Sequence, residues 1–370
     1  MKLTYEQKCY YTDFSKKYFD EGTFYNVNTN VPYYVTIKPT LGCVANCLHC
    51  NPRNKKFERN KLLTLCEYNE LFNSLHKMGT KNICFSGGEP LLYKDIVKLV
   101  KVATNNKLKV SINTNGYLLN TKIFDELINA GVLAFNISID SPFSAIHDNL
   151  RRLNGLYDKV ISNITECKKK REDFILNIRM VLSKYNYKDI DKMIDMALEL
   201  DADLLSIDLI EADSKNKYFL LTESEINKFK NDFVPSLIDK IGKMNISNKL
   251  KKFNIKEIQD IFNTEFNDIK NFENGIYWPD DRIKKKCDIP NTFMIIEGDG
   301  NVLPCNAVEY CRENIVGNVF DTKIEQLWNS EKWNEFRKNK MCFCNECPMN
   351  MSFMILFKER KIEREYYEGN

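Results

Sequence analysis

The sequence predicts an α/β fold, a partial TIM-like (β/α)6 barrel, followed by a small C-terminal α+β domain. Six short apolar runs alternate with helical segments between residues 31 and 213, the pattern of a parallel sheet with right-handed crossovers. Chemically distinctive residues follow several of these runs, at the end where such barrels carry their sites. A second group of cysteines begins at residue 287 and marks the smaller domain.

The six expected strands are rich in β-branched and aromatic residues and are closed by glycine, proline or polar turns. They are expected at residues 33–40, 82–85, 108–113, 133–139, 174–182 and 203–210. The segments between them have the apolar spacing of helices. Helices are expected at 64–78, 93–106, 121–130, in a longer region reaching 171, and at 188–200.

The composition suggests five parts of the chain. We expect a lead-in at 1–30, the barrel at 31–213, a connector of two or three amphipathic helices at 214–286, the cysteine-containing domain at 287–350 and a charged, helical tail at 351–370. Within the C-terminal domain, Gly298-Asp299-Gly300 between two apolar runs predicts a β-hairpin. A helix is expected after it, at 323–338.

Charge and cysteine usage narrow the function classes. The 54 basic and 51 acidic residues nearly balance, which argues against nucleic acid or a membrane surface as a partner. The first residues do not resemble a signal peptide, and no apolar run approaches the ~20 residues that span a bilayer, so we expect a cytoplasmic protein. In a reducing compartment, 13 cysteines beside only three histidines favour sulfur-ligated iron over disulfides.

The strongest single motif is C-x3-C-x2-C, formed by Cys43, Cys47 and Cys50 directly after the first expected strand. A four-iron cluster normally takes four thiolates, so three leave one iron open to another ligand. Open metal positions are where chemistry occurs. The alternative is a structural zinc site with a distant fourth cysteine.

The second motif is Gly87-Gly88-Glu89-Pro90, after the second expected strand, where a glycine pair lets a ligand approach the backbone. With the cysteine triplet, this turn resembles the radical S-adenosylmethionine (SAM) superfamily over roughly residues 31–210. The resemblance implies that the triplet holds a [4Fe–4S] cluster whose fourth iron is chelated by SAM. It also implies reductive cleavage of SAM to a 5′-deoxyadenosyl radical that takes a hydrogen atom from substrate.

The same resemblance implies a set of SAM-binding residues. His49 matches the position near adenine, and Gly87, Gly88 and Glu89 match the turn at the SAM amino group. Further residues are needed to bind the hydroxyl groups of ribose or substrate and the carboxylate of SAM. A guanidinium group is suited to the carboxylate. The candidates for these roles are Asn115, Ser138, Asp140, Arg151 and Arg179. The alternative for each is a solvated or salt-bridged residue.

The C-terminal cysteines resemble the SPASM/twitch extension of radical SAM enzymes. Cys287, Gly300 and Cys305 match its opening, and no cysteine follows Cys347, so one auxiliary [4Fe–4S] cluster is expected rather than two. Its expected ligands are Cys287, Cys305, Cys344 and Cys347. Cys311 and Cys342 could replace a ligand, and Cys311 could instead be a catalytic thiol that returns a hydrogen atom. The alternative is a structural zinc site built from the same four cysteines.

Three functions remain open at this point. The first is modification of a ribosomally synthesised peptide by crosslinking, thioether formation or epimerisation. The second is dehydrogenation or rearrangement of a small molecule, such as a sugar alcohol or a cofactor precursor. Either would need a reducing partner such as flavodoxin or ferredoxin. The third is a non-catalytic iron–sulfur or zinc scaffold, which is disfavoured because Gly87-Gly88-Glu89 has no evident structural need at a strand end.

Overall fold

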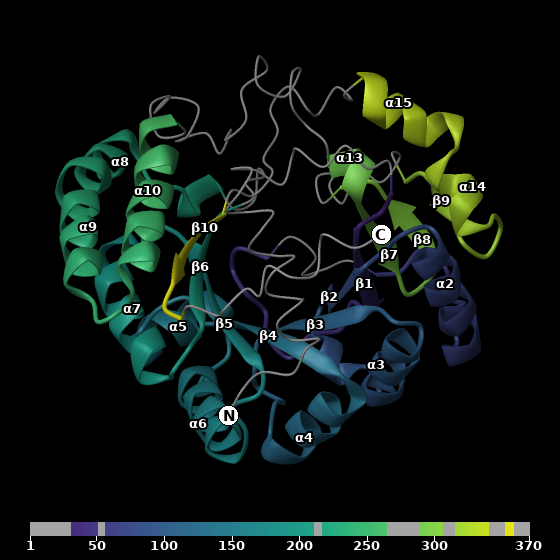
Figure 1. The fold of residues 1–370 in the computed structure, drawn as a ribbon, viewed down its shortest axis with the longest axis horizontal. Helices are drawn as coiled ribbons and strands as arrows, with labels where there is room; N and C mark the ends of the chain where they lie inside the picture. The colour runs from purple at the N-terminus through teal and green to yellow at the C-terminus, as the bar shows by residue number, and fades with distance from the viewer. Residues whose placement is uncertain are drawn as a thin grey trace.

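The structure, a computed structural model, describes residues 31–50, 56–210, 217–264, 289–305, 315–339 and 352–358. At its centre lies one curved sheet, whose described strands follow the order β10-β6-β5-β4-β3-β2-β1-β7-β8-β9. Helices cover its outer face, as Figure 1 shows for α3, α4 and α6. The lead-in expected at 1–30 lies outside the described residues.

The six expected barrel strands are all present. They are β1 (Tyr34–Thr40), β2 (Asn82–Gly87), β3 (Lys109–Thr114), β4 (Val132–Ser138), β5 (Ile175–Leu182) and β6 (Leu204–Leu209). Each pairs in parallel with the next. The sheet does not close on itself, which confirms the partial (β/α)6 barrel. The carboxyl ends of all six strands therefore form one rim.

The helices between these strands bury apolar faces against the sheet. They are α2 (Leu65–Lys77), α3 (Ile96–Asn105), α4 (Thr121–Ala130), α5 (Ser144–Arg151), α6 (Leu156–Lys170) and α7 (Ile190–Glu199). Short 3-10 helices lie at η2 (Pro90–Leu92) and η3 (Tyr187–Asp189). In α4, Phe124 packs on Phe135 of β4 and on Phe174. The helical region expected up to 171 is divided, because Arg152 and Gly155 have φ values of 53° and 74°.

The connector lies beside the β6 end of the sheet (Figure 1). Its elements are η4 (Lys217–Phe219), α8 (Glu223–Lys228), the π-helical turn η5 (Phe229–Phe233), α9 (Val234–Lys243) and α10 (Asn248–Thr264). These agree with the expected amphipathic helices as far as residue 264. The buried Asn254 side chain accepts from the Leu356 N–H at 2.9 Å and donates to its carbonyl at 2.9 Å. The connector is thereby fixed to the last described strand.

The C-terminal segment continues the barrel sheet. The expected hairpin is present as β7 (Phe293–Glu297) and β8 (Asn301–Leu303), followed by β9 (Gly317–Asn318). Strand β7 pairs in parallel with β1, so the hairpin belongs to the same hydrogen-bonded sheet. The described helices here are α13 (Ile289–Thr292), α14 (Ile324–Trp328) and α15 (Glu331–Asn339). The helix expected at 323–338 is therefore two helices.

The expectation of a helical tail is wrong for its first residues. Residues Ser352–Leu356 form β10, which pairs antiparallel with β6 at the edge of the sheet opposite β9. Ile355 and Leu356 are buried, so their apolar side chains and the unpaired edge of β6 together favour a strand. Among the described residues, no helix is both long and apolar enough to cross a bilayer.

Candidate functional site

The cysteine loop, defined as residues 41–50, leaves β1 at the rim of the barrel. Cys43 is exposed, Cys47 is buried and Cys50 is partly buried, and none of them forms a disulfide. Burial raises the pKa of the Cys47 thiol above the ordinary value. A metal that binds here would therefore have to displace the thiol protons, because metals bind cysteine as the thiolate.

The Gly87-Gly88 turn packs directly on this loop. The Gly88 N–H donates to the Thr40 carbonyl at 3.0 Å, and the Glu89 N–H donates to the Gly42 carbonyl at 2.7 Å. A Cβ on Gly88 would lie 2.1 Å from the Gly42 oxygen. A Cβ on Gly87, whose φ is 114°, would lie 2.4 Å from the Thr40 oxygen. The expectation that this turn has no structural need is thus wrong, because Gly88 is required for close backbone contact with the cysteine loop and Gly87 for close contact with the end of β1.

Glu89 holds the end of β3. Its carboxylate is buried and accepts from the Thr114 hydroxyl at 2.7 Å, the Asn115 N–H at 2.8 Å and the Leu91 N–H at 3.1 Å. Burial raises the pKa of Glu89, and these donors oppose the rise. The Asn115 Nδ2 lies 3.7 Å from the Cys43 sulfur and donates to it. Glu89 is therefore connected to the cysteine loop through Asn115.

A buried ion pair stands on the other side of the loop. The Arg151 Nε and Nη2 donate to the Asp140 carboxylate at 2.6 and 2.8 Å, while Nη1 donates to the Cys47 sulfur at 3.8 Å. Burial alone would raise the pKa of Asp140, but the Arg151 guanidinium holds it well below its usual range. The Val181 N–H also donates to Asp140, at 3.0 Å. The predicted SAM partners Asp140 and Arg151 are thus brought together.

The carboxyl end of α5 receives the cysteine loop. The Asn46 N–H donates to the Arg151 carbonyl at 3.1 Å, and the Leu48 N–H donates to the Leu150 carbonyl at 2.9 Å. Carbonyl groups at a helix end lack partners within the helix, so these bonds satisfy both the helix and the loop. We call these two bonds, together with the Asp140–Arg151 pair and its bond to Cys47, the α5 contact.

Two histidines lie beside the ion pair. His147 is fully buried, and its Nδ1 accepts from the Asp140 N–H at 3.0 Å. Burial lowers the pKa of His147 to about 4, and the nearby Asp140 opposes the shift. Burial likewise lowers the pKa of His49 to about 4. Both imidazoles are therefore neutral at pH 7, and an adenine-binding role for His49 remains a prediction.

The last two predicted SAM partners lie side by side in the sheet. Ser138 of β4 and Arg179 of β5 are in register. The Arg179 guanidinium forms an ion pair with Asp208 of β6, with nitrogen–oxygen distances of 2.8 Å from Nε and 2.6 Å from Nη2. Burial would lower the pKa of Arg179, but Asp208 raises it above its usual range. Roles for Ser138 and Arg179 in SAM binding remain predictions.

A polar ladder crosses four strands, and the sequence reasoning missed it. The Asn136 Nδ2 donates to the Asn113 Oδ1 at 2.8 Å, and the Asn177 Nδ2 donates to the Asn136 Oδ1 at 2.9 Å. The Ser206 hydroxyl continues the ladder to the Asn177 Oδ1 at 3.0 Å. The available signal was the single asparagine in each of the strands β3, β4 and β5.

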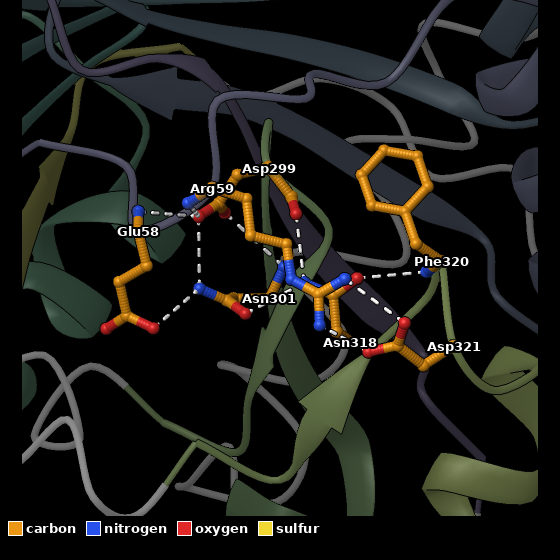
Figure 2. A network of polar contacts seen from close by, with 7 residues as sticks. All are labelled: Glu58, Arg59, Asp299, Asn301, Asn318, Phe320 and Asp321. Atoms are coloured by element: carbon orange, nitrogen blue, oxygen red, sulfur yellow. Dashed lines mark hydrogen bonds and ion pairs between the residues drawn. The ribbon is translucent and has the colours of Figure 1, made fainter.

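The β7–β8 hairpin forms hydrogen bonds to the chain that follows the cysteine loop (Figure 2). The buried Asp299 carboxylate accepts from the backbone N–H groups of Glu58 at 2.9 Å and Arg59 at 3.2 Å. It also accepts from the Asn301 Nδ2 at 3.1 Å, and the Asn318 Nδ2 donates to the Asp299 carbonyl at 2.9 Å. Nearer the solvent, the Arg59 guanidinium forms an ion pair with Asp321. We call this set of bonds the hairpin contact.

The auxiliary ligands are only partly described. Cys305 follows β8 and is partly buried. Cys287, Cys311, Cys342, Cys344 and Cys347 lie outside the described residues. Within the described ranges, no three Cys, His, Asp or Glu side chains are grouped as ligands of a single ion. A four-iron cluster needs no such group, because each thiolate binds a different iron. The reduced thiols of the triplet, two of them with N–H donors, fit such a cluster.

Two protein-family models match the chain. The model described as the radical SAM superfamily matches residues 37–197, and the model described as an iron–sulfur cluster-binding domain, SPASM, matches residues 287–348. Together they cover the rim with the cysteine loop and the segment with all six C-terminal cysteines.

Curated relatives match the chain over about half of its length. An AdoMet-dependent heme synthase of Methanosarcina barkeri is 32% identical over 174 residues, which are 47% of this chain and 49% of that protein. A PqqA peptide cyclase of Bradyrhizobium diazoefficiens is 29% identical over 178 residues, 48% of this chain and 46% of that protein. The chain spans about half the length of these relatives.

A solved structure extends the similarity to most of the fold. The crystal structure of Streptococcus suis SuiB bound to S-adenosylmethionine matches with a TM-score of 0.64 and 18% identity. The match covers 86% of this chain and 71% of SuiB. At this identity the match concerns the fold.

Proposed function

Because the chain belongs to the radical SAM superfamily and carries a C-terminal SPASM domain, we propose that it modifies a ribosomally synthesised peptide. The two family matches imply a SAM-binding [4Fe–4S] cluster, SAM itself and auxiliary iron–sulfur chemistry. When bound, these groups supply an electron and the 5′-deoxyadenosyl radical that takes a hydrogen atom from substrate. In this proposal Cys43, Cys47 and Cys50 hold the SAM-binding cluster.

One observation carries the cluster assignment. The α5 contact and the Glu89–Asn115 pair turn N–H donors toward the sulfurs of Cys47 and Cys43. Buried cations and amide donors beside thiols favour the negatively charged thiolates that iron requires. The remaining contribution of the chain is positional, because the barrel has to hold the reacting C–H group near the radical carbon and exclude water.

The peptide substrate is supported by the relatives. PqqA peptide cyclase is named for a peptide, and SuiB has been solved with its precursor peptide SuiA. A small-molecule substrate is the second candidate, because the heme synthase has the higher identity and GTP 3′,8-cyclase of Clostridium perfringens also matches. The polar ladder of the barrel is compatible with either class. A low-potential partner of the flavodoxin or ferredoxin class would supply the electron in both cases.

The first test is of SAM cleavage. Cys47→Ala should abolish formation of 5′-deoxyadenosine by the reduced, reconstituted enzyme. Cys66→Ala is the matched control, because Cys66 is exposed on α2 and stands apart from the cysteine loop in the sequence. We expect this control to keep the wild-type rate of SAM cleavage. Deoxyadenosine formation that survives Cys47→Ala would refute the ligand assignment.

The second test counts iron. Two four-iron clusters predict about eight irons per chain after anaerobic reconstitution. About four would remove the auxiliary site, and about twelve would add a second auxiliary cluster. Cys344→Ala should retain some SAM cleavage but lose substrate turnover.

The third test separates the substrate classes. The reduced enzyme is incubated with SAM and a synthetic peptide that corresponds to a short reading frame beside its gene, should one be found there, and both the mass of the peptide and the chirality of its residues are measured. We expect deoxyadenosine to form together with a peptide that has lost two hydrogen atoms or has been epimerised. An unmodified peptide, with turnover of a porphyrin or nucleotide instead, would favour the small-molecule candidate.

A further inference from the structure

Two carboxylates each hold an N–H donor against one sulfur of the cysteine triplet. Glu89 binds the backbone of Asn115, whose side chain donates to Cys43. Asp140 binds the guanidinium of Arg151, which donates to Cys47. The two arrangements come from different strands, β2 to β3 in the first case and β4 to α5 in the second, and they converge on one loop.

The orientation of the Asn115 amide is fixed by a second bond. Its Oδ1 accepts from the Tyr117 N–H at 2.9 Å, so its Nδ2 is the group that faces the Cys43 sulfur at 3.7 Å. The Asn115 backbone is held in turn by Glu89 at 2.8 Å. Both ends of the residue are therefore constrained before any cluster binds, and the donor to Cys43 needs no rearrangement.

The Arg151 guanidinium is divided between two partners. Two of its nitrogens face Asp140 and the third faces Cys47. The pair is neutral overall, but its positive end points at the sulfur and its negative end points away. Arg151 and Asp140 are 7% and 0% exposed, so water screens this dipole weakly.

Hydrogen bonds to the sulfurs of an iron–sulfur cluster stabilise its reduced state, which carries one more negative charge, and so raise its reduction potential. We infer that Asn115 and Arg151 raise the potential of the SAM-binding cluster, and that Glu89 and Asp140 are the positioning residues of these two donors. In this step one electron passes from a flavodoxin- or ferredoxin-class donor to the cluster, and no bond forms or breaks. The inference rests on the proposed cysteine ligands.

The test is the midpoint potential of the SAM-binding cluster in the reconstituted full chain, followed by its electron paramagnetic resonance signal. Asn115→Leu removes the donor to Cys43 with little change in side-chain volume. Arg151→Lys keeps the positive charge but cannot serve Asp140 and Cys47 together. Each variant should lower the reduction equilibrium constant about tenfold, which is about 59 mV for a one-electron couple.

Asn136→Leu is the matched control, because its amide bonds Asn113 and Asn177 rather than a thiol. It should keep the wild-type potential. An unchanged midpoint in Asn115→Leu or Arg151→Lys, with the cluster intact, would overturn the role of that donor. A shift of equal size in Asn136→Leu would overturn both, since the change would then be general to the barrel.

If Asn115→Leu fails to retain the cluster, Asn115→Ser, whose hydroxyl is too short to reach the sulfur, takes its place with the same expected shift. The measurement needs no substrate, so a failure to modify peptide leaves it valid. Failure of the proposed function would have a different result: the electron paramagnetic resonance signal of the cluster would not change when SAM is added, or it would persist in Cys47→Ala.

Discussion

The α5 contact binds the cysteine loop itself. The hairpin contact binds the chain that follows the loop, at Glu58 and Arg59. The α5 contact places a buried guanidinium between a carboxylate and a thiol. The hairpin contact uses a buried carboxylate whose partners are backbone and amide N–H groups, and its ion pair is exposed. Of these two contacts, only the α5 contact buries a positive charge, and it does so beside a thiol. In the proposed function the α5 contact acts on the cluster ligands, whereas the hairpin contact only attaches the chain to the sheet.

The largest effect is expected from Arg151→Met. It leaves the Asp140 carboxylate buried without its cation, which should lower the free energy of unfolding by about 3–5 kcal/mol. Urea denaturation under anaerobic conditions measures the loss. The double variant Asp140→Asn with Arg151→Met should recover much of it, because no charge is then left unpaired. If the double variant were as unstable as the single one, loss of packing rather than charge would be the cause.

Asp299→Asn tests the hairpin contact. The neutral amide keeps one acceptor but loses the charge that binds the Glu58 and Arg59 N–H groups, so we expect a loss of about 1.5–3 kcal/mol in the free energy of unfolding. Arg59→Gln is the control, because it breaks only the exposed ion pair with Asp321 and should leave the denaturation midpoint within error. Equal losses in the two variants would contradict the distinction between the buried and exposed parts of this contact.

Gly88→Ala tests the backbone contact between the Gly87-Gly88 turn and the cysteine loop. The new Cβ would lie 2.1 Å from the Gly42 oxygen, so the loop has to shift, at a cost of about 1–3 kcal/mol and with loss of cluster iron. Gly242→Ala is the matched control. A Cβ at this position in α9 would meet no atom within 4 Å beyond the local helix backbone, and alanine should stabilise the helix by about 0.5–1 kcal/mol. Full iron retention in Gly88→Ala would show that the loop adapts.

The smallest effect concerns the pH dependence of stability that His147 causes, through its bond to the Asp140 N–H. The His147 pKa is about 4 in the folded chain, whereas an unfolded histidine has a pKa of about 6.5. Between these values the unfolded chain binds a proton that the folded chain does not, so His147 lowers stability as the pH falls, by at most about 1.4 kcal/mol per pH unit. His147→Gln should show a smaller fall in thermal midpoint between about pH 7 and about pH 5.5. Parallel curves for the two proteins would contradict this assignment.

The sequence predicted the barrel because its six strands carry strong, locally readable apolar runs. It also predicted that Cys43, Glu89, Asn115 and Asp140 meet at one rim, since parallel strands end on the same side. It did not predict that Glu89 and Asp140 hold donors for the cysteines. The donors that these two buried carboxylates hold for the cysteines lie 11 positions or more away in the sequence. A local sequence pattern therefore cannot identify them.

Strand β10 was missed for a related reason. Its five residues precede a charged tail, and a short apolar run is compatible with either a helix or a strand. Only the exposed edge of β6, nearly 150 residues earlier, decides the outcome. The polar ladder was missed for a similar reason. Its asparagines can be recognised as hydrogen-bond partners only when the register of β3, β4 and β5 is known.

The pairing of β7 with β1 has a consequence for protein engineering. A chimaera designed from the family matches alone would be cut where the SPASM match begins, at residue 287. Such a cut would exchange a strand of the barrel sheet itself, together with the Asp299 acceptor that the parent chain needs for its own Glu58 and Arg59. A crossover placed after β8 would leave those contacts with their native partners. The position at which the two parts of the chain can be exchanged therefore lies inside the SPASM match, after β8, rather than at residue 287.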